Sequence, residues 1–438
     1  MLHIQRTSGP VKTILTSLLA LLCAGLPAAD RYVSLDGTND FANKFNTWAG
    51  AATNLEWAVN AALAGETVWV SNGTYYLTNQ ITIANLKLRS WPDGISRRKT
   101  TIVNGNYPFY TNRCFVLNDA AALVEGFTIT NAFRIHDANQ FSGGGGVFMT
   151  AGTLRNCLVT GNTITNGQGG GVAARFANTI ITNCDLIGNT VQGNSTTSTG
   201  RGGGAALIQG AQIWNSRINQ NVAWSRYMYD GGGGAYGGVI YNSEVVSNIA
   251  YEFGGGVCTP TLMRNCLVAE NTSFGTGDRG GGGCAYYSGT GFQVDSCTIV
   301  SNRGRWAGGI YFFSAGSVFV TNSIVFSNVT DASVSCNMNR HTAYGSTVTC
   351  DRVCTTNVLN VTFIGSGNIT NQAPMFADFL NRNYRLLPHS PCVNAGINQS
   401  WMNGALDLDN RNRVDKFSGR ADMGCYEFHP QGIMFKVK

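Results

Sequence analysis

Five residues in two separate polar segments could take part in the cleavage of an acidic polysaccharide. Arg226, Tyr227 and Asp230 lie in the first segment, and Asp278 and Arg279 lie in the second. A polysaccharide lyase uses a cation or an arginine to neutralise the carboxylate of a uronate, and a base such as lysine, arginine, tyrosine or histidine to take up a proton. The residue types therefore fit a lyase better than a hydrolase. Their spacing matches no catalytic motif, so catalysis is one alternative among several.

The same part of the chain is rich in aromatic residues and arginines, which could bind sugars without cleaving them. Aromatic rings stack on sugar faces, and an arginine pairs with a carboxylate or sulfate through two hydrogen bonds. The glycan-binding candidates are Trp224, Tyr229, Tyr251, Phe274, Arg303, Arg305 and Trp306. The alternative is that these rings pack the loops onto the body of the protein and that the charged groups are solvated.

Acid–base and metal chemistry elsewhere in the chain have less support. His136 and Asp137 are adjacent and could form an acid–base pair, but a single loop histidine is more often simply exposed. Asp407 and Asp409 could bind calcium, but Arg411 stands where a third ligand is needed, so a plain turn is favoured. We therefore expect no cofactor and no metal, with Ca²⁺ as the alternative.

A repeated unit must position these segments. Between Gly144 and Asn328 the chain repeats, seven times, a Gly-rich turn, a short apolar segment and the motif Asn-(Cys or Ser)-x-aliphatic-x-x-Asn. Periods of about 20–50 residues are typical of stacked repeats. The asparagines that close the motif recur at intervals of 23 to 32 residues, and they are Asn162, Asn189, Asn221, Asn248, Asn271, Asn302 and Asn328.

Apolar and variable positions alternate within each repeat, which predicts strands with one buried face. One apolar column, two positions before the first asparagine, contains Leu154, Ile181, Ile213, Ile240, Met263, Val294 and Val320. A second, three positions after it, contains Val159, Leu186, Ile218, Val245, Val268, Ile299 and Val325. No repeat has room for a buried helix, so each is predicted to be a coil of short strands stacked on the last, about 4.8 Å apart. At the turns we expect left-handed asparagines, hydrogen-bonded asparagine stacks and glycines that permit close backbone approach.

Cysteine and serine interchange in one inward column, which indicates that small size is what this position requires. The cysteines of this column are predicted to be buried thiols, and they are Cys157, Cys184, Cys266 and Cys297. Cys336, Cys350 and Cys354 follow the repeats and are better disulfide candidates in an exported protein.

These columns resemble the right-handed parallel β-helices of the pectin lyase-like fold. The pairing of Gly-Gly-Gly-Val with Val-x-x-x-Asn or Ile-x-x-x-Asn is also similar to the repeats of polymorphic outer-membrane proteins. The resemblance implies an all-β right-handed parallel β-helix (solenoid), with an N-terminal capping helix and a small C-terminal tail region. Hydrolase families of this fold carry paired aspartates and a Gly-His-Gly signature, and this sequence contains neither.

The ends of the chain differ from the repeats. Arg6 and Lys12 precede a short apolar run, as in a secretory signal. Thr53-Asn54-Leu55-Glu56 is a capping box that predicts the start of the capping helix. The predicted divisions are a signal peptide (1–29), an N-terminal cap with the first irregular rungs (30–122), the regular β-helix repeats (123–330), and the final rungs with the C-terminal tail (331–438).

Charge and hydropathy limit the partners. The formal charge of +6 is too diffuse to favour nucleic acid. No stretch after the signal approaches the 18 or so apolar residues of a membrane span. We expect a secreted, periplasmic or cell-surface protein that binds extracellular or cell-surface polysaccharide or acts as an adhesin. The alternatives are a polysaccharide lyase or glycosidase of the same fold acting on an acidic glycan, and a purely structural surface coat.

Overall fold

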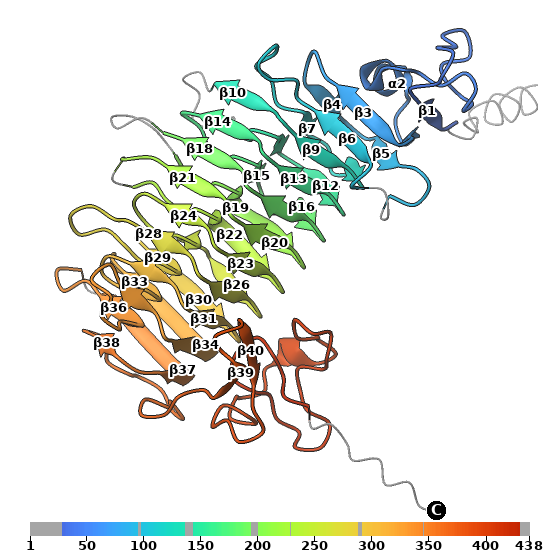
Figure 1. Ribbon diagram of the computed structural model, residues 1–438. Helices are drawn as coiled ribbons and strands as arrows, with labels where there is room; N and C mark the ends of the chain where they lie inside the picture. The colour runs from blue at the N-terminus through green and yellow to red at the C-terminus, as the bar shows by residue number, and fades with distance from the viewer. Residues whose placement is uncertain are drawn as a thin grey trace, which may run out of the picture.

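The computed structural model describes residues 29–94, 98–135, 143–193, 200–227, 229–287, 291–344 and 346–429. These residues form a right-handed parallel β-helix, in which successive strands pair in parallel with the equivalent strands of the next coil, or rung. The all-β solenoid predicted from the repeats is therefore confirmed (Figure 1). The predicted signal peptide lies almost wholly outside the described residues.

Four ladders of strands run along the solenoid. Ladder A contains β4 (Ile81–Ile83), β7 (Phe115–Leu117), β11 (Val147–Met149), β15 (Val172–Arg175), the first parts of β19 (Ala205–Trp214) and β22 (Ala235–Tyr241), β25 (Val257–Cys258), β29 (Cys284–Tyr286), β33 (Ile310–Phe312), β36 (Met338–Arg340) and β38 (Val358–Leu359). Ladder B contains β1 (Arg31–Val33), β2 (Thr67–Val70), β5 (Lys87–Ser90), β8 (Leu123–Glu125), β12 (Gly152–Arg155), β16 (Thr179–Thr182), the second parts of β19 and β22, β26 (Leu262–Arg264), β30 (Gly291–Asp295) and the first parts of β34 (Ser317–Phe326) and β37 (Thr347–Thr355).

The other two ladders complete each rung. Ladder C contains β3 (Gly73–Tyr76), β6 (Thr101–Asn104), β9 (Thr128–Thr130), β13 (Leu158–Thr160), β17 (Asp185–Ile187), β20 (Arg217–Asn219), β23 (Glu244–Val246), β27 (Leu267–Ala269), β31 (Thr298–Val300) and the second parts of β34 and β37. Ladder D is a separate sheet of short strands: β10 (Phe133–Ile135), β14 (Thr163–Thr165), β18 (Thr190–Gln192), β21 (Val222–Trp224), β24 (Ile249–Ala250), β28 (Thr272–Ser273), β32 (Arg303–Gly304) and β35 (Val329–Thr330).

The core is the continuous apolar interior that the two predicted columns line. Every member of both columns is fully buried and belongs to one cluster. Val245, for example, pairs in register with Ile218 on one side and Val268 on the other. A single rung could not bury these side chains alone, so the stacking of rungs is what makes the core.

The two asparagines of the motif have different roles. The first of each pair, which is replaced by Ser296 in the sixth repeat, adopts a positive φ at the turn between ladders B and C, as in Asn183 (52°), Asn215 (48°) and Asn242 (46°). The closing asparagines are instead fully buried and form a hydrogen-bonded stack. Each side-chain Nδ2 donates to the Oδ1 of the next asparagine at 2.9–3.1 Å, from Asn162 as far as Asn337. Both predicted roles are confirmed, one in each column.

Glycines allow the turn between ladders D and A to stack tightly. Gly202 has a φ of 71°, and a Cβ at Gly203 would lie only 2.4 Å from the carbonyl oxygen of Gly233 in the next rung. Any side chain there would force the rungs apart, which explains the repeated glycine cluster.

The helix α2 (Leu55–Ala61) lies at the N-terminal end, with Leu55, Ala58 and Val59 buried (Figure 1). Its cap differs from the predicted capping box, because Asn54 is the N-cap and accepts hydrogen bonds from the backbone N–H groups of residues 56 and 57. The Thr53 hydroxyl, predicted to cap, donates instead to Asn39 at 3.0 Å.

The C-terminal segment folds back along the solenoid instead of extending it. It contains the antiparallel pair β39 (Phe376–Asp378) and β40 (Asn383–Leu386) and a short 3-10 helix, η1 (Ser400–Met402). It packs beside the last rungs (Figure 1), where the Cys425 N–H donates to the Thr298 hydroxyl at 3.1 Å. Asn322 receives the segment through two hydrogen bonds with the backbone of Ile397, at 2.8 and 2.9 Å.

All twelve cysteines among the described residues are buried free thiols. The four cysteines of the inward column are therefore buried as predicted. Cys336, Cys350 and Cys354, predicted as disulfide candidates, are free thiols in this structure, and they lie in three different clusters of the protein. Cys350 points into the solenoid core, whereas Cys354 points outward toward the C-terminal segment.

Candidate functional site

The loops that leave ladder D and lead back to ladder A project on one side of the solenoid (Figure 1). They contain most of the residues singled out from the sequence. The structure divides these residues into two groups: side chains that form a row along ladder D, and side chains that hold the loops against ladder A.

Three aromatic residues form the row, which we call the aromatic ladder: Trp224, Tyr251 and Phe274. Trp224 ends β21, while the backbone N–H groups of Tyr251 and Phe274 bond to Ala223 and Ala250 at 3.0 and 3.1 Å and so keep the ladder register. Ring centroids are 5.3 Å apart for Trp224–Tyr251 and 6.4 Å for Tyr251–Phe274. Trp224 is 48% and Phe274 47% exposed, and Tyr251 on the rung between them is half-buried.

Arginines flank the aromatic ladder. The Arg226 guanidinium lies 5.0 Å from the centroid of the Tyr251 ring, within the range of a cation–π contact. Arg305 follows β32 and is exposed one rung beyond Phe274. Arg303 donates to the carbonyl oxygen of Asp331 at 2.5 Å, which fixes it on the same side. Burial raises the pKa of the Asp331 carboxyl, and Arg303 and Arg305 oppose this rise.

Tyr229 and Trp306 belong to the second group. The Tyr229 ring lies 5.8 Å from the ring of Tyr287, which is buried under the loops. The Trp306 indole N–H donates to the carbonyl oxygen of Gly277 at 2.9 Å, which ties this ring to the neighbouring loop although its side chain is 38% exposed. These two rings therefore help to hold the loops in place.

Two of the charged catalytic candidates, Asp230 and Arg279, form contacts that fix the loops in place. Asp230 is 1% exposed, accepts the Gly200 N–H at 2.8 Å and lies 3.5 Å from Arg201. Arg279 forms an ion pair with Glu252 at 3.0 Å. Glu252 is itself 1% exposed, and burial raises its pKa, opposed by Thr276 and Arg279.

The structure does not gather the five catalytic candidates around one point. The ion pairs of Asp230, Arg279 and Asp278 are all formed with residues that are not catalytic candidates. Asp278, for instance, lies 3.8 Å from His341. Tyr227 contacts the ring of Tyr229, with centroids 6.1 Å apart. The pair His136 and Asp137 lies outside the described residues. No group of three or more His, Cys, Asp or Glu side chains suited to a metal occurs in the part of the chain that the structure describes.

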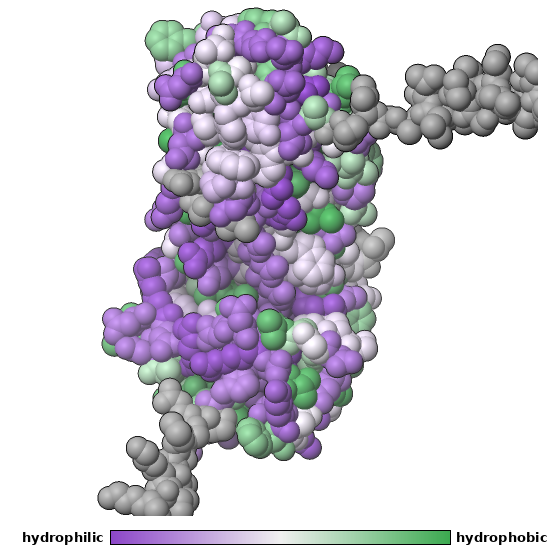
Figure 2. Space-filling model, turned by 90° about the vertical axis from the view of Figure 1, so that its right-hand side faces the viewer, coloured by the Kyte–Doolittle hydropathy of each residue, from purple (hydrophilic) through white to green (hydrophobic). Residues whose placement is uncertain are grey.

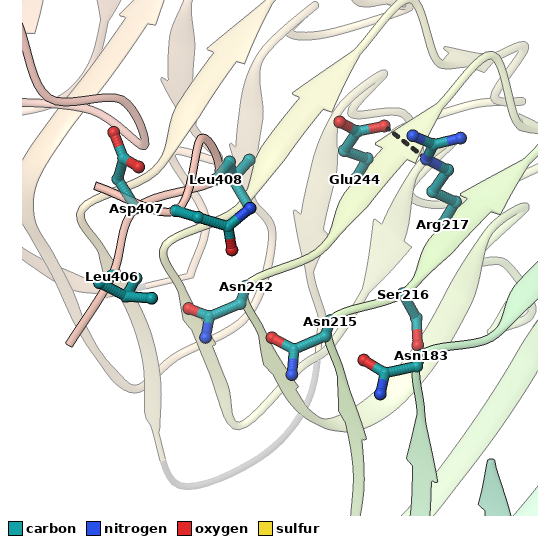
Figure 3. Close-up of a pocket in the computed structure, with 10 residues that line it drawn as sticks. Asn183, Asn215, Ser216, Arg217, Asn242, Glu244, Leu406, Asp407 and Leu408 are labelled. Carbon is teal, nitrogen blue, oxygen red and sulfur yellow. Dashed lines mark ion pairs between the residues drawn. The ribbon is translucent and has the colours of Figure 1, made fainter. Parts of the chain in front are cut away.

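A groove that the sequence pattern does not reveal lies on another side of the molecule. It has a volume of about 450 Å³ and lies between the turns that follow ladder B and the C-terminal segment. Asn183, Asn215 and Asn242 line it with their amides side by side, one from each rung (Figure 3). Leu406 and Asp407 form part of the opposite wall. The repeated asparagine was visible in the sequence, but the groove exists only because the C-terminal segment folds back.

The rim of the groove is polar. Arg217 and Glu244 face each other across neighbouring rungs at 3.5 Å (Figure 3). On the face shown in Figure 2 the surface is mostly hydrophilic, and hydrophobic residues occur as small scattered patches. Large contiguous apolar patches mark protein or membrane contacts. Among the described residues no helix combines the length and the apolar character that crossing a bilayer requires.

A family model, "Protein of unknown function (DUF1565)", matches residues 88–255. The structure is similar to that of pectate lyase Pel9A, with 11% identity, a TM-score of 0.49, and coverage of 92% of this chain and 98% of that chain. It is also similar to the catalytic unit of the GH87 α-1,3-glucanase of Streptomyces thermodiastaticus strain HF3-3, with 12% identity, a TM-score of 0.37, and coverage of 80% and 69%. A search of curated proteins found no match.

Proposed function

We propose that this protein is exported and binds a polysaccharide chain along the aromatic ladder. The observation that carries the proposal is the row of Trp224, Tyr251 and Phe274 on three successive rungs, in which the two outer rings are exposed and the middle ring is half-buried. Apolar ring surface in contact with water is unfavourable. A row of such rings on a stable scaffold therefore favours a ligand whose flat apolar faces can cover them. Sugar rings have such faces and carry hydroxyl groups that stay hydrated at the edges.

The spacing suits a chain that lies along the solenoid axis. Rungs are about 4.8 Å apart, so three rings span roughly 10 Å. An extended polysaccharide can place successive sugars over such a row, and a rigid ladder holds the rings ready without ordering a loop. Arg226 and Arg305 stand beside the row and favour an acidic glycan, because a guanidinium pairs with carboxylates and sulfates.

Binding is favoured over cleavage by what the catalytic candidates already contact. Asp230 and Arg279 are engaged with Arg201 and Glu252 inside the loops. A general base must reach the proton that it removes, and a buried carboxylate paired with an arginine is poorly placed to do so. A role as an adhesin for surface glycans uses the same row of rings.

The test is binding of the purified protein to a panel of acidic and neutral polysaccharides by calorimetry and retention on immobilised polymer. We expect retention on an acidic polymer, and weaker retention for Trp224→Ala and Phe274→Ala. Phe417→Ala is the matched control, because Phe417 is 91% exposed on the distant C-terminal segment. Unchanged binding in both ladder variants would refute the proposed surface. Release of unsaturated or reducing products would show that the protein is an enzyme.

A further inference from the structure

Two cysteines meet where the C-terminal segment packs on the solenoid. Cys354 lies near the end of β37, and its ladder neighbour Ile324 also points outward. Cys392 belongs to the C-terminal segment, beyond the β39–β40 pair. Both side chains are fully buried and belong to one cluster with Ile324, Leu386 and Met423.

The backbone holds both residues in place. Cys354 lies in β37, in register with Ile324, and forms a further bridge with Ile369. The Cys392 N–H donates to the Ser390 hydroxyl at 3.1 Å, and its carbonyl oxygen accepts the Met423 N–H at 3.0 Å. The two side chains share one buried cluster, and the influence of Cys354, together with burial, raises the pKa of the Cys392 thiol.

Other neighbouring cysteines meet in a different geometry. Cys157 and Cys184 belong to one column of the core on successive rungs, so their side chains run parallel. Each thiol donates to a carbonyl oxygen two residues earlier in its own chain, at 3.2 Å in both cases. A disulfide requires the two Cβ–S bonds to turn toward one another, which parallel side chains on a rigid ladder resist. Cys354 and Cys392 come instead from two packed layers, the solenoid and the C-terminal segment, and meet in one buried cluster.

We propose that Cys354 and Cys392 form a disulfide that fastens the C-terminal segment to the last rungs of the solenoid. Both S–H bonds are lost and one S–S bond forms. Two electrons and two protons pass to a disulfide oxidant such as glutathione disulfide, which is reduced to two thiols. One cysteine thiolate attacks the oxidant to give a mixed disulfide, and the second displaces the glutathione thiolate. Because both thiols are buried after docking, the exchange takes place while the segment is still folding onto the solenoid.

The proposed bond explains how a segment with little regular structure is retained. Its described residues, up to 429, contain one short strand pair and one 3-10 helix, and short structures of this kind are marginal on their own. The bond would keep Leu406 and Asp407 in place as a wall of the groove. The predicted export signal would deliver the chain to a compartment where such bonds persist.

The test is peptide mapping of the purified protein after refolding with glutathione disulfide. Free thiols are alkylated in denaturant without reduction, and digests are analysed by mass spectrometry. We expect one linked peptide pair that contains Cys354 and Cys392, with Cys157, Cys184, Cys266 and Cys297 alkylated. Alkylation of both Cys354 and Cys392, or linkage of either to another cysteine, would overturn the proposal.

A second measurement follows the segment itself. Limited proteolysis of the oxidised parent, with and without dithiothreitol, should show faster cleavage within residues 370–429 only after reduction. Cys354→Ser and Cys392→Ser should be cleaved quickly in both conditions, whereas Cys266→Ser should behave as the parent does. If reduction leaves the parent's cleavage rate unchanged, no such fastening exists, and this result does not depend on whether any variant folds.

Discussion

The side-chain Nδ2 of Asn221 donates to Oδ1 of Asn248 at 3.0 Å, and the same oxygen accepts the backbone N–H of Asn221 at 2.9 Å. One amide therefore satisfies a side chain and a backbone group of the preceding rung. Asn221 also donates to the carbonyl oxygen of Leu186 at 2.8 Å. Each of these hydrogen bonds links two rungs. Because the atoms are shielded from water, no water molecule can replace a partner that is lost.

Asn221→Ala should be strongly destabilising. It leaves the Leu186 carbonyl and the Asn189 N–H without the side chain that bonds to them, and it removes one of the two hydrogen bonds to the Asn248 Oδ1. Each unsatisfied buried group costs about 1–3 kcal/mol, so we expect the free energy of unfolding to fall by roughly 2–5 kcal/mol. Urea denaturation measures this loss. Asn79→Ala is the control, since Asn79 is exposed and its side chain bonds only to neighbouring Thr78. Equal stability of the Asn221 variant and the parent would contradict the role of the stack.

Val245→Asp tests the register of the solenoid. Val245 is fully buried in the core between Ile218 and Val268, so an aspartate there places an unpaired charge in the apolar interior. We expect a loss of more than about 3 kcal/mol, or failure to fold. Val222→Asp should cost far less, because Val222 is only half-buried and its column on ladder D holds Thr190 and Arg303 in other rungs. A Val245 variant as stable as the Val222 variant would show that the column does not face the core.

The sequence was sufficient to predict the ladders, because a period of two within each strand and a fixed order of columns leave only one way to bury the apolar residues. The asparagine and cysteine columns followed from the same argument. The sequence was not sufficient to show that Trp224 and Trp306 have different roles, since both are aromatic residues in equivalent loops. Only the fold shows that Trp224 continues a strand whereas Trp306 bonds to Gly277.

Contacts between distant parts of the chain could not be predicted for a similar reason. The docking of Cys392 beside Cys354, and the return of Leu406 toward Asn242, depend on a C-terminal segment that has no repeat. Without a period, no column shows which side chains point inward. Three cysteines were therefore predicted as disulfide candidates without any indication of their partners, and their side chains lie in separate clusters.

The aromatic ladder should respond to ring removal in steps. If each ring stacks on one sugar, Trp224→Ala should weaken binding about 5- to 150-fold, which corresponds to the roughly 1–3 kcal/mol measured when bases stack on aromatic side chains. Trp224→Phe should retain part of the affinity because a ring remains. Calorimetry with the polymer that the parent binds gives both values. An equal loss in the alanine and phenylalanine variants would argue against stacking at this position.

Trp306→Ala should act differently from Trp224→Ala. Removal of the indole frees the Gly277 carbonyl and loosens the loop that carries Asp278 and Arg279. We expect faster proteolysis at that loop together with a smaller loss of affinity than in the Trp224 variant. Limited proteolysis and calorimetry on the same preparations distinguish the two effects. A Trp306 variant that loses affinity as strongly, with its loop still protected, would place this ring in direct contact with the glycan.

A buried ion pair in the C-terminal segment should make stability depend on pH. The side chains of Arg413 and Glu427 are fully buried and 3.0 Å apart. Burial raises the pKa of Glu427 to about 8, an effect that Arg413 opposes and Asp422 reinforces. Burial also raises the pKa of Asp422 to about 6. Both carboxyls therefore hold protons more tightly in the folded state than in the unfolded state, where their pKa values are ordinary.

The sign of the effect follows from this difference. Between about pH 4.5 and pH 8 the folded chain binds a proton at Glu427 that the unfolded chain has lost, so the free energy of unfolding falls as the pH rises through this interval. We expect the midpoint of thermal unfolding to decrease from pH 5 to pH 8. Glu427→Gln should flatten the curve, because the amide does not titrate yet can still accept the Asp422 N–H that Glu427 accepts at 3.0 Å. The carboxyls of Asp40, Asp378 and Asp415 have lowered pKa values and titrate below this range, so they leave the comparison unaffected. If the curve of the Glu427→Gln variant runs parallel to that of the parent, Glu427 does not titrate in this interval.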